Sequence, residues 1–206
     1  MDALIAVAGV IAVAAITPGP NNLVVMLAAQ RAGIVGALPS IAGVLAGSLA
    51  LFAVALTGVG VMVMAEPALR TAITLAGCAY LTWLGTKLVV RRTASPAPAA
   101  DPLSHAHPQS GLPNGLIGLF AFQFLNPKAW VLVLTATAAA QGPEGIPAPA
   151  VALLFVVIPA LCLLLWSALG RSLTHWMQRP AARTRFDRAM GVLLIASALA
   201  LAAGSP

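Results

Sequence analysis

The sequence predicts an all-α integral membrane protein with six transmembrane helices, arranged as two inverted three-helix repeats. Three observations support this prediction. Only 8% of the 206 residues are charged, 60% are hydrophobic, and the mean hydropathy is +0.97, which leaves too little polar surface to cover a water-soluble globule. Several apolar segments are long enough to cross a bilayer. Polar, helix-breaking clusters interrupt the first apolar segment of each half of the chain.

Six apolar segments are long enough for transmembrane helices. A helix needs about 20 residues to cross a hydrocarbon core that is roughly 30 Å thick. The second and fifth segments are the clearest because no charge interrupts them, whereas the sixth has a short apolar part. The segments span residues 3–30, 37–64, 67–90, 115–140, 148–170 and 186–203.

The first and fourth segments are broken near their middles, and hence near the midplane of the membrane. Thr17-Pro18-Gly19-Pro20-Asn21-Asn22 interrupts the first, and Asn126-Pro127-Lys128 interrupts the fourth. Proline removes a backbone donor and glycine tolerates unusual dihedral angles. Polar groups freed in lipid must be satisfied by protein, water or a ligand. Interrupted segments at corresponding places in two halves indicate the binding site of a secondary transporter, with a structural kink as the alternative at each break.

The positive charges report topology. The net charge is +6, and apart from Arg70 and Lys128 every basic residue follows the first, third or fifth predicted helix. The positive-inside bias makes these loops cytoplasmic, so both termini are expected outside. We prefer this interpretation, with contact to anionic lipid, over nucleic-acid binding. The residues are Arg31, Lys87, Arg91, Arg92, Arg171, Arg179, Arg183, Arg185 and Arg188.

One long polar connector divides the chain. Residues 93–113 are rich in proline, serine and histidine and are typical of a flexible linker, here cytoplasmic. We therefore expect a first repeat at 1–92 and a second at 114–206. Because three is an odd number of crossings, the second repeat must cross the membrane in the opposite sense to the first.

Three motifs carry a family resemblance. They are Thr-Pro-Gly-Pro-Asn-Asn-Leu at 17–23, Ala-Gly-x-x-Tyr-Leu-x-x-Leu-Gly at 76–85 and Gln-Phe-Leu-Asn-Pro-Lys-Ala at 123–129. With them, almost the whole chain resembles the LysE/RhtB family of bacterial amino-acid exporters. The resemblance implies a small inner-membrane protein that exports amino acids and related metabolites, driven by the proton gradient. The Pro-Gly-Pro-Asn-Asn form is similar to the subgroup exporting cysteine and O-acetylserine. Many relatives have an aspartate where this chain has Asn21.

Lys128 is the only charge that the sequence places deep in the membrane, because all five acids fall at helix ends or in loops. A lysine there should face a protein-lined or watery cavity. We interpret its ammonium as the partner of a substrate carboxylate, assisted by the positive N-terminal end of the half-helix after Pro127. Two alternatives stay open, a structural lysine that binds carbonyls freed at the break and a proton-titrating group.

Amide groups provide the other half of the predicted site. With no buried carboxylate expected, a substrate ammonium would be held by amide oxygens and by the unwound backbone around 18–20. A neutral cradle suits a zwitterion and disfavours a substrate with an additional charge, so we expect small neutral amino acids. Helix capping is the alternative role for each amide. The candidate residues are Asn21, Asn22, Gln123 and Asn126.

Other classes of function fit the sequence less well. An enzyme would need a nucleophile with a base, paired carboxylates or a metal cluster at membrane depth, so we expect neither enzymatic activity nor a cofactor or metal. Gly43 and Gly47 form a G-x-x-x-G pair that favours packing within the chain, with a homodimer interface as the alternative. Export of another small zwitterionic or anionic metabolite, or a non-transporting assembly role, are the alternatives to amino-acid export.

Overall fold

The computed structural model describes residues 2–59, 65–90, 115–141, 145–174 and 179–203, together with residues 62 and 176. All regular elements in these ranges are helical. The predicted linker at 93–113 lies outside the described residues. The elements are α1 (Asp2–Ile16), α2 (Pro20–Val54), a π-helical turn η1 (Ala55–Val59), α4 (Pro67–Val90), α5 (Gly115–Leu125), α6 (Pro127–Gln141), α7 (Ala148–Ser172) and α8 (Pro180–Ala203).

Both predicted helix breaks are confirmed. The first lies between α1 and α2, where Gly19 has an extended backbone (φ −160°) and Pro20 takes the first helical position of α2, a place where its missing N–H costs nothing. The second lies between α5 and α6, where Asn126 alone is non-helical and the two helices are bent by 69°. Proline therefore starts a new half-helix at both breaks.

One helix boundary agrees with the prediction and one differs. The helix α2 is interrupted at Ala32 and at Gly33 (φ +69°), a conformation that glycine adopts without strain, and this interruption lies in the gap predicted between the first and second segments. The helix α8 begins at Pro180, six residues before the predicted start at 186, because Arg183 and Arg185 point outward on an added helical turn. The predicted second segment reaches residue 64, but 60, 61, 63 and 64 lie outside the described residues.

Asp187 corrects the expectation that every acid lies at a helix end or in a loop. It lies two turns inside α8 and is only 6% exposed. The earlier start of α8 is the reason, since the added turns bring Asp187 into the packed part of the helix.

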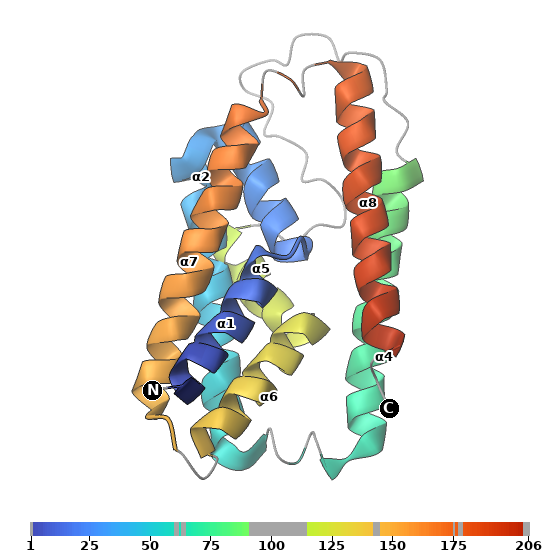
Figure 1. The fold of residues 1–206 in the computed structure, drawn as a ribbon. Coiled ribbons are helices and arrows are strands. Elements are labelled where there is room, and N and C mark those ends of the chain that lie inside the picture. Colours follow the sequence, from blue (N-terminus) through green and yellow to red (C-terminus); the bar gives the residue numbers. More distant parts are fainter. Residues whose placement is uncertain are drawn as a thin grey trace.

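The helices pack against one another in defined pairs. In Figure 1, α2 lies beside α7 and α5, α1 crosses α7, and α4 pairs with α8. Glycines permit the close approaches: a Cβ at Gly47 would lie 2.7 Å from the carbonyl oxygen of Phe120, and one at Gly191 would lie 2.5 Å from that of Gly85. The G-x-x-x-G pair at 43 and 47 thus packs against α5 of the same chain.

Two described elements are long and apolar enough to cross a membrane by themselves, α2 with η1 and α7. The bent pair α5 and α6 would make a third span, whereas 3–16 and 74–90 form shorter apolar helices. The start of α1 and the end of α8 lie toward the same, lower end of the molecule (Figure 1). An all-helical, multi-pass membrane protein is consistent with this arrangement, and the count of six spans stays a prediction.

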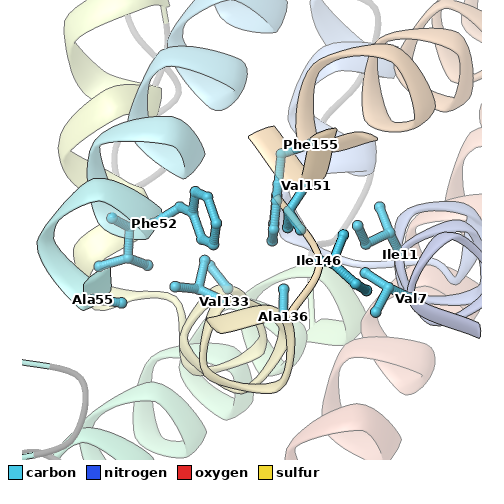
Figure 2. Packing of buried hydrophobic residues seen from close by; sticks show 11 residues of the cluster. Val7, Ile11, Phe52, Ala55, Val133, Ala136, Ile146, Val151 and Phe155 are labelled. Carbon is cyan, nitrogen blue, oxygen red and sulfur yellow. The ribbon is translucent and has the colours of Figure 1, made fainter. Parts of the chain in front are cut away.

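Two apolar clusters fill the spaces between α7 and its neighbours. Figure 2 shows the first, where Phe52 of α2 stacks on Phe155 of α7 with ring centroids 5.3 Å apart, beside Val133 of α6. The second contains Val44 of α2 and Leu163 of α7. The site described next lies between these two clusters.

Candidate functional site

A cavity of about 70 Å³ lies where the two helix breaks meet. Its wall shares Val133 and Phe155 with the first apolar cluster and Val44 and Leu163 with the second, so the cavity lies between the two clusters. Pockets for drug-sized ligands measure roughly 300–1,000 Å³, so this space admits only a small solute. Seven predicted site residues line it: Gly19, Pro20, Asn21, Asn22, Gln123, Asn126 and Lys128.

Three other predicted residues contribute through the backbone. Thr17 and Pro18 are not among the described lining residues, although the Thr17 carbonyl accepts two hydrogen bonds from residues that are. Pro127 starts α6. These residues were predicted to form the backbone of the two breaks, and the structure places them at those breaks.

Gln123 is the centre of the polar network. It is 2% exposed, and its Oε1 accepts hydrogen bonds from Nδ2 of Asn21 (3.0 Å) and of Asn126 (3.3 Å). Its Nε2 donates to Oγ of Ser48 (2.6 Å) and to the carbonyl of Val44 (3.3 Å). One side chain on α5 therefore ties both breaks to α2.

Two asparagines cap the interrupted helices. Nδ2 of Asn22 reaches back across the first break to the carbonyls of Ala15 (3.0 Å) and Thr17 (2.9 Å), which the end of α1 leaves free. At the second break, Oδ1 of Asn126 accepts from the backbone N–H of Lys128 (3.1 Å), as an N-cap does. These are the contacts that the capping alternative expects.

Lys128 joins the two breaks. Its side chain is half-buried, and Nζ donates to the carbonyl oxygen of Thr17 over 3.0 Å, 111 residues away in the sequence. Nζ also lies 3.5 Å from where a Cβ on Gly19 would be. It is the only charged residue among the described lining residues. The contact with Thr17 is the one that a lysine bound to freed carbonyls would make.

Asn21 leaves one atom unused. Among the residues that the structure describes, no hydrogen-bond partner exists for its buried Oδ1. A buried acceptor without a partner costs free energy comparable to its desolvation, on the order of 1–3 kcal/mol. Asn21 lines the cavity, although this oxygen is itself buried, so a bound donor would remove the cost once the amide turns toward the cavity.

Helix ends give the cavity an electrostatic polarity. The C-terminal turn of α1 contributes Ala14 and Ala15 to the wall, whereas the first residues of α2 and α6 line other parts of it. Helix C-termini carry partial negative charge and N-termini partial positive charge. One molecule with both an ammonium and a carboxylate would match these ends.

Sequence reasoning missed several residues of the wall. Ser48 is one of two buried serines in α2, and only its distant partner Gln123 distinguishes it. Pro159 lines the cavity from α7 beside Phe155. Proline cannot donate to the carbonyl four residues earlier, which is that of Phe155, so a proline inside an apolar helix was the available signal.

Comparison with known proteins identifies the family. Residues 12–205 match the model of the LysE type translocator family. The chain belongs to this family. The family is one of translocators, and the resemblance seen in the motifs is confirmed. No solved structure matches the chain.

Known relatives are similar to this chain over part of its length. Cysteine/O-acetylserine efflux proteins of Salmonella choleraesuis (strain SC-B67) and Salmonella typhimurium (strain LT2) are each 32% identical over 127 residues. A third, from Salmonella typhi, is 31% identical over the same length. The match covers 60% of this chain and 58% of each relative.

Proposed function

We propose that this LysE-type translocator exports a small neutral amino acid or a close derivative across the bacterial inner membrane. The observation that carries the proposal is the cavity between the two breaks, lined by Asn21, whose buried Oδ1 has no partner among the described residues. A substrate ammonium would supply the missing donor. Membrane-embedded binding sites formed by interrupted helices are typical of secondary transporters.

We propose that residues 1–92 and 114–206 are inverted repeats with the binding site between them. The pairing of helices supports this: α1 packs on α7 and α5 packs on α2, while α4 pairs with α8. In a two-fold arrangement the first two contacts are equivalents of each other, and α4 with α8 lies on the axis. Six spans with both termini outside would follow from this arrangement and from the positive-inside bias.

The proposed binding mode uses the polarity of the cavity. The substrate ammonium lies near the unpartnered Oδ1 of Asn21 and near the carbonyls at the end of α1, whose partial negative charge favours a cation. The carboxylate lies toward Lys128 and the N-terminal end of α6. The first N–H groups of α6 already bond to Asn126, so the helix contributes its dipole rather than free donors.

Size and charge favour a small neutral side chain. The cavity is small, and much of its wall is apolar, with Ala14, Val44 and Leu132 among the lining residues. No described lining residue is an acid, so a second cationic group on the substrate would be buried without a counter-ion. The relatives named for cysteine and O-acetylserine efflux make these two compounds the first candidates.

A small monocarboxylate without an ammonium is the second candidate. Lys128 favours it, because one ammonium and no acid line the described cavity. Such a substrate would leave Oδ1 of Asn21 without a donor, which is why we place it second.

A substrate panel in an overexpressing strain tests the proposal. The extracellular accumulation of cysteine, O-acetylserine, serine, lysine, glutamate and a small monocarboxylate is compared between induced and empty-vector cells. We expect cysteine, O-acetylserine or serine to accumulate and lysine to stay at the vector level. Accumulation of none of the neutral amino acids would overturn the proposal, and accumulation of the monocarboxylate alone would select the second candidate.

A further inference from the structure

We infer that the Lys128 ammonium is a resident substitute for the substrate ammonium, and that it lets the empty carrier reorient. The inference rests on the proposed function and adds a role in the part of the cycle when no substrate is bound. Its basis is the contact between Nζ of Lys128, which lines the cavity, and the Thr17 carbonyl at the first break.

The Thr17 carbonyl is a favourable place for a cation. It lies directly after α1, whose C-terminal end carries partial negative charge. It already accepts from Nδ2 of Asn22, and the Lys128 ammonium at 3.0 Å is its second donor. Because no acid is among the described lining residues, this carbonyl end is also where the α-ammonium of a substrate would lie.

Two cations cannot hold the same place. When the substrate ammonium approaches the end of α1, Lys128 must leave Thr17, and its Nζ is then available for the substrate carboxylate. When the substrate departs, Nζ returns to Thr17. An ammonium contacts the end of α1 in both forms, and the net charge of the site is the same in both because the substrate is a zwitterion.

This exchange of partners affects the empty carrier most. Without an ammonium, the empty site would leave the Thr17 carbonyl with Asn22 as its remaining described donor and the negative end of α1 without a nearby positive charge, which is unfavourable in a low-dielectric environment. With Lys128 in place, the empty form closes as the loaded form does. The carrier can then return empty and complete net export without a counter-substrate.

Transport in proteoliposomes separates this role from simple substrate binding. Release of radiolabelled L-cysteine is measured as net efflux into amino-acid-free buffer and as exchange against saturating unlabelled L-cysteine. Exchange needs only the loaded carrier to reorient, whereas net efflux needs the empty carrier as well. In Lys128→Met we expect net efflux to fall about tenfold more than exchange, equivalent to about 1.4 kcal/mol on the empty-carrier barrier.

A matched control and a charge-conserving variant complete the transport experiment. Lys87→Met removes a lysine that lies over the Trp83 ring on α4, away from the cavity, and should keep the wild-type ratio of net efflux to exchange. Lys128→Arg keeps the positive charge and should retain more net efflux than Lys128→Met. Equal losses of both modes in Lys128→Met, or no change in either, would overturn the inference.

Chemical rescue tests amine binding at this place without a transport measurement. In Lys128→Ala the place at Thr17 is vacant, and n-propylammonium should fill it. We expect this amine to raise the Tm of the purified variant by about 2 °C or more, with no comparable rise for the wild type or with tetramethylammonium, which cannot donate a hydrogen bond. Absence of an amine-specific rise would count against the inference, whereas wild-type vesicles inert in both transport modes toward cysteine, O-acetylserine and serine would overturn the proposed function itself.

Discussion

Nδ2 of Asn21 donates a hydrogen bond to Oε1 of Gln123 over 3.0 Å, although 102 residues separate them. The first belongs to the break before α2 and the second to α5, just before the other break. Asn126 donates to the same oxygen. One side chain therefore contacts both breaks, as the proposed site between two repeats expects.

Replacing Gln123 should disable both breaks together. Gln123→Leu removes the acceptor of Asn21 and Asn126 and the donor to Ser48, and each lost bond is worth about 0.5–1.5 kcal/mol. We expect the transport rate per inserted molecule to fall more than about tenfold. Ser48→Ala, which loses one bond, should cost only a several-fold decrease.

A double variant checks whether these bonds act as one network. Residues in one hydrogen-bond network are not additive, so Asn21→Ala should reduce transport less in the Gln123→Leu background than in the wild type. Flux measured in the four proteins of this cycle gives the coupling. Independent effects of the two substitutions would show that the network is not a unit.

Close packing of α4 on α8 makes Gly191 intolerant of a side chain. A Cβ there would lie 2.5 Å from the Gly85 carbonyl oxygen, and overpacking of this kind costs typically about 1–3 kcal/mol. We expect Gly191→Val to lower the Tm of the detergent-purified protein. Gly9→Val is the matched control, because a Cβ at Gly9 has no described atom within 4 Å; similar Tm changes in the two variants would contradict the packing described here.

The positive-inside bias predicts the orientation of the chain. Alkaline phosphatase is active only outside the cytoplasm, so a fusion after Pro206 should be active and a fusion after Ser95 should be inactive. Activity is normalised to the amount of fusion protein. The opposite pattern would reverse the orientation, and activity at both positions would contradict three crossings between residues 95 and 206.

Coupling to the proton gradient is a separate expectation. In proteoliposomes, an imposed pH gradient should change the L-cysteine flux of the wild type. Lys128→Arg should bind L-cysteine but lose this dependence if Lys128 is the proton carrier, because a guanidinium stays protonated. A dependence that survives in Lys128→Arg would point to another group, and Asp187 is the buried acid to replace next. Wild-type flux that ignores the gradient would exclude proton coupling.

Local residue types were sufficient to predict the helix breaks. Proline and glycine act on their own backbone, so the ends of α1 and α5 and the starts of α2 and α6 could be predicted from Pro18, Gly19, Pro20 and Pro127. The candidate polar residues of the cavity followed from the same clusters. Gln123 was found because it is an amide in an otherwise apolar segment.

Contacts between distant segments could not be predicted in this way. Nothing local marks the Thr17 carbonyl as the partner of Lys128, or Ser48 as the partner of Gln123. The start of α8 was misplaced because arginines on an exposed helical face resemble a charged loop in a hydropathy pattern. That error also placed Asp187 outside the packed region, although its side chain is buried within it.

Equilibrium binding of radiolabelled L-cysteine to purified protein tests the central claim most directly. The wild type should bind saturably, and Asn21→Ala should bind about tenfold more weakly or worse, because hydrogen bonds to charged groups contribute about 1.5–3 kcal/mol. Thr135→Ala, on the exposed face of α6, should bind as the wild type does. Equal affinities in the wild type and Asn21→Ala, or no saturable binding by the wild type, would contradict the assignment of the substrate site to the cavity between the two breaks.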